Sequence, residues 1–594
     1  MAPLAAALTL TSIALYTTAA LAAGNTTYYN PILPGFHPDP SCIYVPEWDN
    51  TFFCASSSFN AFPGIPLHAS KDLQNWKLIG HVLNRREQLP RLAETNRSTS
   101  GIWAPTLRFN NNTFWLVTTL VDDDRPQSDE SRWDNIIFKG RDPYDPASWS
   151  NAIHFNFTGY DTEPFWDVDG KTYIVGAHAW QVGPYLQLAE ANLDTGAVGD
   201  WQIIWNGTGG MAPEGPHVYR RDGWYYLLAA EGGTGLGHMV TMARSKNITG
   251  PYESNPANPV LTNANTTSLF QTVGHADLFQ DETTSDDNPV RWGVALSTRS
   301  GPNYINYPMG RETVLTAVTW PPNEFPVWTP INGTFTGWTL PPSNATALRG
   351  AGQYVASSDS LTFSSNTTLP LHLTHWRYPH PTSYTLSPTS LLLHPSYLNL
   401  TALNGNYAGP LHGPDGQTFI GRRQTHTLFT YRITLSYNPT TLNEEAGVSA
   451  FLTQNHHITM GIALLPASAS THPFPGTNTS LETGTDLIPQ VRFQAASYVP
   501  VPKTTVMPLP KEWRGSELVL EIKAVTSSHY AFGVGKAGGE IKTVKVADND
   551  AVSWGFTGVI LGAFATRNGG EGKTAAAINA WEYKGEGQAR EWVA

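Results

Sequence analysis

The sequence predicts an all-β protein in which a five-bladed β-propeller is followed by an antiparallel β-sandwich. The first half repeats one strand-turn-strand unit, and its copies begin roughly 50 to 65 residues apart, a period typical of propeller blades. The second half has evenly spaced alternating strands without that unit, as a β-sandwich does. Neither half contains the period of a long amphipathic helix.

The composition suits short strands joined by tight turns and argues against a nucleic-acid partner. The chain has 594 residues, 52 glycines and 45 prolines, which is long enough for two domains. Charged residues make up 14% of it, the formal net charge is -12, and Lys and Arg form no block. Phosphate backbones require a basic face. Aromatic residues reach 11%, and their flat faces suit a neutral partner such as a sugar.

Residues 1–23 are predicted to be a secretory signal peptide. The segment is apolar and closes on small residues, so cleavage is expected near Ala22 or Ala23. A membrane anchor is the alternative, but Thr and Tyr interrupt the run and it is short for a span. About a dozen Asn-x-Ser/Thr sequons, including Asn156 and Asn247, agree with export. We therefore expect a secreted, extracellular protein with no membrane partner.

Five copies of the unit fall within residues 24–328, the predicted propeller. Each copy has a Pro- or Gly-marked start, an apolar stretch, a turn and an aromatic strand that ends in small residues. The innermost strand of each blade lines the central axis, so the equivalent starting positions, here called the axis positions, converge on one funnel. The axis positions hold Asp39, Trp103-Ala104, Asp161 or Glu163, Glu214 and His275. Three carboxylates, an aromatic and a histidine are thus expected at one mouth.

The character of the chain changes after the propeller. Residues 329–350 are rich in Gly, Pro, Ser and Thr and are predicted to be a linker. Residues 351–594 carry strands such as TLFTYRITLSY and SELVLEIKAV, which indicate the sandwich. His456 and His457 fall in one of these strands, and we interpret them as strand residues rather than metal ligands.

The carboxylates at the axis positions suggest hydrolysis of a glycosidic bond. This reaction needs one carboxylic acid to protonate the leaving oxygen and one carboxylate to activate water or attack the sugar, and a third acid can tune its neighbour's pKa. Asp39 lies between Pro38 and Pro40, and Glu214 is bracketed in APEGPH, so both have a restricted backbone. A single Asp or Glu is usually solvated or caps a turn, but repeated bracketed placement favours catalysis.

Three further features are interpreted as structural. The acidic run VDDDRPQSDE, residues 121–130, indicates a solvated loop. The segment EGGTGLG, residues 231–237, ends a strand and opens no helix, so nucleotide binding is not expected. Cys42 and Cys54 flank the turn PEWDN, where a disulfide and two buried thiols are equally compatible, and two cysteines exclude a zinc cluster.

A series of motifs has a recognisable order along the chain: NPILPGFHPDPS, FNAFPGIPLHASKDLQNW, GIWAPTLRF, GYDTEPF, APEGPHVY, GHADLF and MGRETVL. The series resembles glycoside hydrolase family 43, in particular its β-xylosidase and α-L-arabinofuranosidase members. In the second half, FIGRRQTHTLFTYRITL and GFTGVILGAF are similar to the family's accessory sandwich, which is concanavalin A-like. The resemblance implies a five-bladed propeller, an inverting mechanism and no required cofactor.

The resemblance also implies roles for the carboxylates. Asp39 corresponds to the general base that activates water, Glu214 to the general acid, and Asp161 to the residue that modulates the acid's pKa and orients the sugar. Spacing alone does not choose between Asp161 and Glu163, and the family motif favours Asp161. Inversion requires the base and the acid to lie roughly 6.5 to 9.5 Å apart, so that a water molecule fits.

Other residues are implied to bind the substrate. Arg311 resembles the family's arginine near the third carboxylate and the sugar, and Trp103 and Phe62 resemble walls of the subsite for the terminal sugar. His275 matches the channel histidine, near which some members hold a calcium ion, so it is the one candidate ligand for a structural Ca2+. Tyr160 adds a hydroxyl where β-xylosidase-like members commonly read GFDPSLF.

These features favour an exo-acting pentosidase. The polar Tyr160, and His37 in HPDP where NPDP is usual, suggest a subsite for more than a bare terminal xylose. We expect α-L-arabinofuranosidase action on arabinoxylan, with β-xylosidase action on xylo-oligosaccharides as the alternative. An endo-arabinanase is a rival within the class. It would need only the propeller, and the sandwich argues against it, because in similar proteins one of its loops closes one end of the pocket. A carbohydrate-binding propeller would need aromatics rather than acids, and a protein-interaction propeller gives no reason for bracketed acids.

Overall fold

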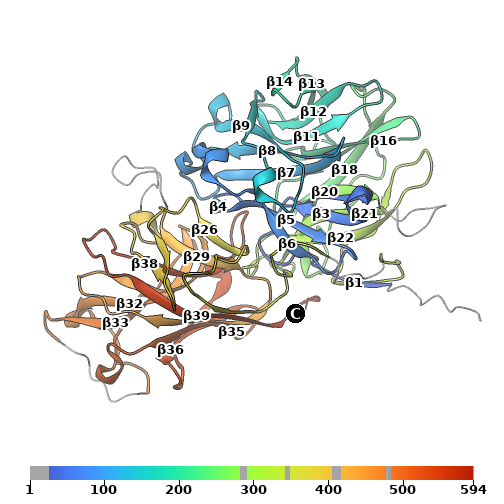
Figure 1. Ribbon diagram of the computed structural model, residues 1–594. Helices are drawn as coiled ribbons and strands as arrows, with labels where there is room; N and C mark the ends of the chain where they lie inside the picture. Colours follow the sequence, from blue (N-terminus) through green and yellow to red (C-terminus); the bar gives the residue numbers. More distant parts are fainter. Residues whose placement is uncertain are drawn as a thin grey trace, which may run out of the picture.

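The computed structural model describes residues 26–592 except 281–290, 342–347, 405–415, 477–480 and 482. It contains the two predicted β domains, which lie against each other (Figure 1). The predicted signal peptide lies outside the described residues. None of the helices in the described part of the chain has the length and apolar character needed to cross a membrane.

Five antiparallel sheets form the blades of the propeller, as the repeat predicted. In each blade the strand order follows the chain, and the third blade carries two short strands, β14 and β15, on β13. The blades consist of β2 (Ser41–Val45), β3 (Thr51–Ala55), β5 (Gly64–Ser70) and β6 (Lys77–Leu83); β7 (Gly101–Asn110), β8 (Thr113–Val121), β9 (Trp133–Gly140) and β10 (Ile153–Phe155); β11 (Gly159–Trp166), β12 (Thr172–His178), β13 (Leu186–Asn192), β14 (Ala197–Val198) and β15 (Gln202–Trp205); β16 (Glu214–Arg221), β17 (Trp224–Glu231), β18 (Met239–Ser245) and β19 (Glu253–Ser254); and β20 (Phe270–Gln280), β21 (Arg291–Arg299), β22 (Glu312–Thr319) and β23 (Val327–Trp328).

The first strands of the blades share a backbone irregularity at the axis positions. In β7, β11, β16 and β20 the pairing register shifts at this point, which is the mark of a β-bulge. One residue per blade has a positive φ there: Asp39 (51°), Ala104 (34°), Asp161 (54°), Gly215 (54°) and His275 (47°). Because a bulge re-aims side chains, the repeat places its functional groups at the strand starts.

The segment before β2 closes the propeller ring by pairing with the last blade. The backbone N–H of Ile32 donates to Thr313 O at 3.0 Å, and Thr313 N–H donates to Leu33 O at 3.2 Å. The side chain of Asn30 donates to Leu315 O at 2.9 Å and accepts from Leu315 N–H at 2.8 Å. The ring is therefore joined at the chain segment that leads to Asp39.

The connection between the domains is packed against the propeller along much of its length. Within it, β24 (Thr334–Thr336) pairs with β1 (Thr27–Tyr29), and Leu348 is buried in the core of the first blades. Just beyond the predicted linker 329–350, Gln353 O accepts from Leu78 N–H at 3.0 Å. In the described part of this connection, the Gly- and Pro-rich composition thus marks turns of a segment that packs on the propeller.

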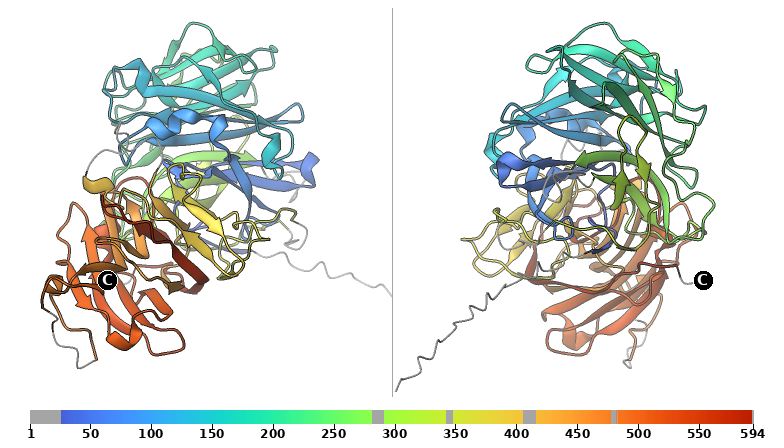
Figure 2. Two further views of the ribbon diagram at one scale, coloured as in Figure 1. Left: turned by 60° about the vertical axis from the view of Figure 1, so that its left-hand side comes forward. Right: turned by 90° about the vertical axis from the view of Figure 1, so that its right-hand side faces the viewer.

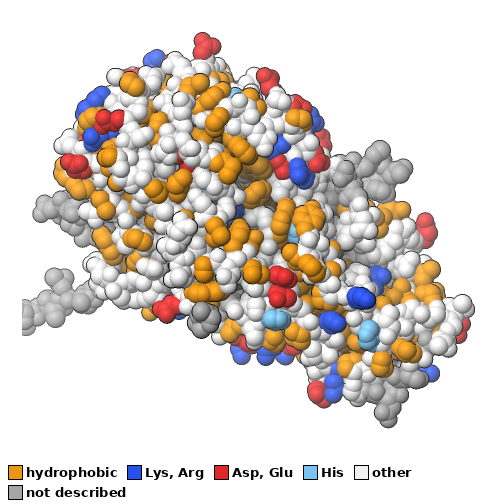
Figure 3. Space-filling model, turned by 180° about the vertical axis from the view of Figure 1, so that it is seen from behind, with side chains coloured by type: hydrophobic (Ala, Val, Ile, Leu, Met, Phe, Trp, Pro, Cys, Tyr) orange, Lys and Arg blue, Asp and Glu red, His pale blue; other side chains and the backbone are white. Residues whose placement is uncertain are grey.

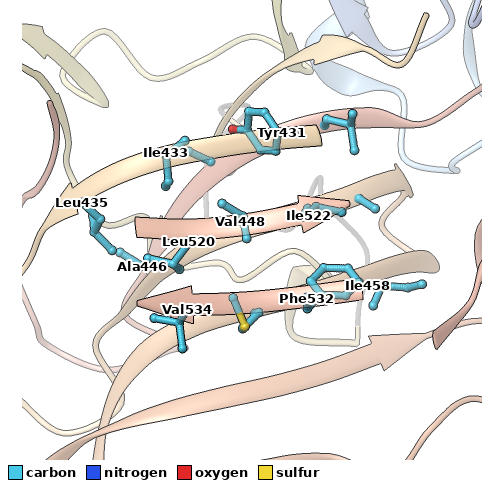
Figure 4. Close-up of a cluster of buried hydrophobic side chains, with 14 of the residues drawn as sticks. Tyr431, Ile433, Leu435, Ala446, Val448, Ile458, Leu520, Ile522, Phe532 and Val534 are labelled. Atoms are coloured by element: carbon cyan, nitrogen blue, oxygen red, sulfur yellow. The ribbon is translucent and has the colours of Figure 1, made fainter. Parts of the chain in front are cut away.

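The C-terminal domain is a sandwich of two antiparallel sheets around one hydrophobic core. Aliphatic and aromatic side chains of the two sheets face each other in this core (Figure 4). The strands are β25 (Asp359–Thr362), β26 (Leu373–Trp376), β27 (Tyr384–Leu386), β28 (Leu391–Leu393), β29 (Thr418–Arg423), β30 (Leu428–Ser436), β31 (Glu445–Thr453), β32 (His456–Pro466), β33 (Leu487–Ala496), β34 (Thr505–Pro508), β35 (Leu518–Ala524), β36 (His529–Lys536), β37 (Lys542–Asp548), β38 (Ile560–Thr566) and β39 (Ala576–Gly587).

Helical structure in the described residues is confined to short 3-10 turns in loops. They are η1 (Pro46–Trp48), η2 (Arg86–Gln88), η3 (Pro90–Glu94), η4 (Glu130–Arg132), η5 (Pro146–Ser148), η7 (Ala402–Asn404), η8 (Ala467–Ala469), η9 (Lys511–Trp513) and η10 (Asn549–Val552).

A two-residue strand of the first blade belongs to a sheet of the sandwich. This strand, β4 (Ala61–Phe62), pairs with β26, with Phe62 opposite His375 and Ala61 opposite Trp376. The sandwich accordingly lies directly against the propeller in both views of Figure 2. The two domains therefore share backbone hydrogen bonds as well as side-chain contacts.

The structure settles the state of the two cysteines, and one face of the molecule shows how the charges are distributed. Cys42 and Cys54 lie opposite each other on β2 and β3 and form a disulfide. On the face seen in Figure 3, Lys and Arg side chains are scattered among uncharged ones and form no extended basic area.

Candidate active site

Three buried carboxylates line one pocket at the mouth of the propeller axis. Asp39, Asp161 and Glu214 are each at most 9% exposed and share a cavity of about 620 Å3. They come from the axis positions of the first, third and fourth blades. A cavity of this size suits a small ligand that is largely enclosed.

Asp39 is held by a bidentate ion pair with Arg311. Nη1 and Nη2 of Arg311 lie 2.9 and 3.2 Å from the carboxylate oxygens, and Ser57 Oγ donates to Asp39 at 2.6 Å. Burial alone would raise the pKa of Asp39, but Arg311 and the other neighbours outweigh burial and lower it below its ordinary value. The group is therefore ionised at neutral pH, as a base must be.

This pairing adds detail to the expectation for Arg311. The resemblance placed this arginine near the third carboxylate, Asp161; its charge does act on Asp161, and its direct ion pair is with Asp39. The reason is the ring closure: Arg311 directly precedes β22, and the segment that carries Asp39 runs alongside the start of that strand.

Glu214 has the opposite electrostatic surroundings. Burial raises the pKa of Glu214 to about 7, while the hydroxyl of Tyr160, which donates to Oε2 at 3.0 Å, counteracts part of this rise. A carboxyl group whose pKa lies near the working pH can be protonated at rest and still release its proton. Glu214 is therefore suited to donate a proton.

Asp161 lies between these two groups. Its Oδ2 accepts from the backbone N–H of Gly215 at 2.9 Å, while burial and the charge of Glu214 raise the pKa of Asp161 well above its ordinary value. The ring of His275 lies 3.9 Å from both Asp39 and Asp161, and burial lowers the pKa of His275 to about 4, so the ring is neutral. Asp161 is thus placed to influence the charge of its neighbours.

The alternative carboxylate, Glu163, lies deeper in the channel. It pairs with Arg108, whose Nη1 is 2.8 Å from Asp277, and its Oε1 lies 3.3 Å from Nδ1 of His217. Glu163 follows Asp161 by two residues, one strand period, but its side chain does not line the pocket. Geometry therefore selects Asp161 as the third pocket acid.

The channel residues do not fit a calcium ion ligated by the protein. Calcium takes six to eight oxygen ligands. The channel carboxylates Glu163 and Asp277 are both paired with the Arg108 guanidinium. No group of three or more His, Cys, Asp or Glu side chains among the described residues is arranged to hold a metal ion. We derive no step from a metal at His275.

Aromatic side chains form one wall of the pocket, and one of them comes from the sandwich. Phe59, Trp103 and Phe556 line the cavity, and the ring centroids of Phe59 and Phe556 are 5.9 Å apart in a stacked arrangement. Phe62, the expected wall, lies outside the lining and packs edge-on against Tyr378. Its strand β4 turns toward the sandwich, so Phe59, three residues earlier, takes the place at the pocket.

The rim contains residues that the sequence analysis assigned to a solvated loop. Asp123, Asp124 and Arg125 of the acidic run line the pocket, and Asp123 forms an ion pair with the buried Arg132. The low hydrophobicity of this run matched an exposed loop, and only the fold reveals that it borders the axis. Thr234 of the EGGTGLG segment also lines the pocket.

Two functional contacts gave no local signal in the sequence. Phe556 follows the pocket residues by more than 240 positions, and its carbonyl oxygen accepts from Arg311 Nε at 3.0 Å. His456 stacks on Trp554, with ring centroids 4.5 Å apart, and so supports the loop that carries Phe556. His456 therefore has a structural role: it supports the loop that brings Phe556 to the pocket.

The arrangement can hydrolyse a glycosidic bond. An ionised carboxylate and a carboxyl group of raised pKa face the same pocket, and this difference defines a base and an acid. The base can take a proton from water while the acid protonates the leaving oxygen.

Comparison with known proteins agrees with this chemistry. Residues 28–326 match the description Glycosyl hydrolases family 43, and residues 360–584 match Beta xylosidase C-terminal Concanavalin A-like domain. A non-reducing end alpha-L-arabinofuranosidase of Bacteroides ovatus is 32% identical over 550 residues, which cover 91% of this chain and 92% of the relative. A xylosidase/arabinosidase of Humicola insolens is 38% identical over 299 residues, or 49% of this chain and 53% of the relative.

Solved structures match across both domains. The family 43 protein of the Bacteroides ovatus xyloglucan PUL is 30% identical with a TM-score of 0.77, and the match covers 94% of this chain and 100% of that one. A family 43 protein of Bacillus licheniformis is 26% identical with a TM-score of 0.75 at the same coverage. The chain therefore belongs to glycoside hydrolase family 43, in its group of arabinofuranosidases and xylosidases.

Proposed function

We propose that this protein is a secreted, exo-acting, inverting α-L-arabinofuranosidase that removes terminal arabinofuranose side chains from arabinoxylan. The observation that carries the proposal is the opposite shift of the pKa values of Asp39 and Glu214 in one enclosed pocket. In this mechanism Asp39 removes a proton from a water molecule that attacks the anomeric carbon. Glu214 protonates the departing glycosidic oxygen, and Asp161 orients the sugar and modulates the pKa of Glu214.

The wall formed by Phe556 supports exo action. Its ring comes from the sandwich, lines the pocket and contacts Phe59 and Trp103 of the propeller. A polymer cannot pass through a pocket that is closed on this side, but a terminal sugar can enter it. The hydroxyl of Tyr160 offers a polar contact next to the acid, and the long match to an arabinofuranosidase supports the choice of sugar.

β-Xylosidase action on xylo-oligosaccharides is the second candidate. Relatives named xylosidase/arabinosidase and beta-xylosidase, which match 49% and 43% of the chain, support it. Initial rates on 4-nitrophenyl α-L-arabinofuranoside and 4-nitrophenyl β-D-xyloside compare the two activities. Faster turnover of the xyloside would favour the second candidate.

Two variants test the assignment of the base and the acid. We expect Asp39→Asn to lower kcat about 1000-fold on every substrate, because removing a general base costs roughly 100- to 10,000-fold. Glu214→Gln should lose as much on an arabinoxylan oligosaccharide but much less on the 4-nitrophenyl glycoside, whose leaving group needs little protonation. Equal losses of Glu214→Gln on both substrates, or full activity of either variant, would contradict these roles.

The stereochemistry and export can be measured directly. Proton NMR of the first product should show the β-anomer of arabinose if the α-linkage is cleaved with inversion, and the α-anomer would exclude inversion. In a eukaryotic secreting host, the protein should be found in the medium with an N-terminus near Ala23. Its mass should fall on deglycosylation, since the sequon residues Asn156, Asn247 and Asn366 are exposed.

A further inference from the structure

A small polar cavity lies between the two domains, beneath the segment that leads to Asp39. Its volume is about 30 Å3, which exceeds the space needed for one water-sized particle. Its polar lining consists of His37 and His68 from the propeller and Gln353, His372, Arg422, Arg423 and Thr425 from the chain beyond it, with no carboxylate among the lining residues.

Arg423 brings an unbalanced positive charge to this cavity. The residue is 6% exposed, its Nε donates to Phe36 O at 3.0 Å, and its Nη2 has no hydrogen-bond partner. Among the described residues, no Asp or Glu lies within ion-pair distance of it. A buried guanidinium without a counter-charge is strongly unfavourable.

The carboxylate that binds the other polar lining residues is already paired. Asp359 receives Arg422 Nη1 at 2.9 Å and the amide of Gln353 at 2.9 Å, and His372 Nε2 lies 3.2 Å from its other oxygen. The charges of Arg422 and Asp359 therefore balance each other. The positive charge of Arg423 is left without a counter-charge from the described residues.

The histidines around Arg423 can supply hydrogen-bond donors but no negative charge. His68 is 2% exposed, its Nδ1 has no partner, and its ring lies edge-on to that of His37 with the centroids 4.9 Å apart. Burial and the charge of Arg423 hold the pKa of both rings well below its ordinary value, so both are neutral. A neutral imidazole offers one N–H.

We propose that this cavity binds a small monovalent anion of about the size of chloride as the counter-ion of Arg423. The unpartnered Nη2 of Arg423 and Nδ1 of His68 are the donors that would hold it. A water molecule could satisfy these donors but would leave the charge unbalanced, and the small volume favours a halide over sulfate or phosphate. Because Arg423 also binds Phe36 O, three residues before Asp39, the anion fastens the base-bearing segment to the sandwich.

Thermal unfolding of the full-length protein tests the proposal. Sodium chloride or bromide should replace sodium gluconate at constant ionic strength, and we expect a saturable rise in Tm of roughly 2 to 4 °C. Arg423→Met should abolish the halide dependence. Arg432→Met, which removes an arginine that is 42% exposed and paired with Glu521, should retain it. A rise that is absent, or equal in both variants, would overturn the proposal.

Crystals of the unaltered protein grown in sodium bromide give a second test that does not depend on any variant. An anomalous peak in the cavity, within hydrogen-bond distance of Arg423 Nη2, supports the site. Water density without anomalous signal at the bromide edge would overturn it.

Discussion

Asp39 and Asp161 adopt φ values of 51° and 54°, a backbone region that costs a non-glycine residue about 1–3 kcal/mol. Each is fixed there by a specific partner, Arg311 for Asp39 and the backbone N–H of Gly215 for Asp161. The strain is therefore tied to the orientation of the two carboxylates toward the axis. At this scale the site depends on bulge geometry as much as on the choice of acid.

The hydroxyl of Tyr160 should control the alkaline limit of activity. Glu214 acts as an acid only while protonated, so activity falls as pH rises through its pKa of about 7. The Tyr160 hydrogen bond favours the ionised form and lowers this pKa. In Tyr160→Phe the pKa rises, and the alkaline limb of kcat/KM on an arabinoxylan oligosaccharide should move up by about one pH unit, since a hydrogen bond to a charged group is worth roughly 1.5 kcal/mol or more.

Tyr219→Phe is the matched control for this prediction. Its hydroxyl donates to the buried carboxylate of Asp277 at 2.7 Å, outside the pocket. We expect its pH profile to keep the alkaline limb of the unaltered enzyme. A limb that moves equally in both variants, or in neither, would show that Tyr160 does not tune the acid.

Single residues also mark the limit of sequence prediction. Asp39 and Glu214 stand out because prolines and glycines bracket them at repeated positions. Phe59 and Phe62 are three residues apart with the same side chain, and only the direction of β4 separates their roles. Arg311 shows the same limit, because its partner depends on how the ring closes.

Among the elements, the loop of the sandwich between η10 and β38 completes the pocket. Its Phe556 contacts Phe59 and Trp103, and its backbone binds Arg311, which in turn holds the base. The loop therefore acts on the substrate through its ring and on Asp39 through its backbone. These two contributions can be separated experimentally.

Phe556→Ala removes the ring and leaves the carbonyl that binds Arg311. We expect kcat/KM on the aryl arabinofuranoside to fall about tenfold, which corresponds to roughly 1.4 kcal/mol of transition-state binding, mostly through KM. Phe165→Ala, a half-buried ring at the other end of the channel, is the control and should leave kcat/KM unchanged. If the two variants have equal kcat/KM, Phe556 does not contribute to binding the sugar.

At the level of the whole molecule, closure of the ring rests on a few buried hydrogen bonds. The Asn30 side chain is 1% exposed and makes three of them, to Leu315 N–H, Leu315 O and Asn332 O. Its side-chain amide thus forms the pair of hydrogen bonds with Leu315 that the backbone of a neighbouring strand would form, at the junction of the first and last blades. Its loss would leave buried backbone groups unsatisfied.

Asn30→Ala should lower the free energy of unfolding by about 3 kcal/mol, because each buried unsatisfied group costs roughly 1–3 kcal/mol. Urea unfolding followed by tryptophan fluorescence measures the change. The control is Asn192→Ala, which removes an exposed side chain that accepts two turn N–H bonds, and it should cost about 1 kcal/mol or less. Similar losses for the two variants would mean that Asn30 has no special part in closure.

The architecture was predictable because each blade repeats its own local signals. Turn residues, apolar runs and bracketed acids recur with one period, so blade number and axis positions follow from the sequence. The contacts between the domains have no such period. The contacts of Phe556, the pairing of β4 with β26 and the pairing of β24 with β1 each join segments far apart in the chain, and a single sequence gives no signal for them.

The pairing of β4 with β26 has a consequence for the order in which the chain is made. Ala61 and Phe62 leave the ribosome some 312 residues before Thr374, whose side chain binds Phe62 O. At 5–20 residues per second this delay is roughly 15 to 60 s. During that interval the first blade presents an unpaired strand, which invites association with other chains. The nascent propeller is thus most exposed to aggregation while its sandwich is still being translated.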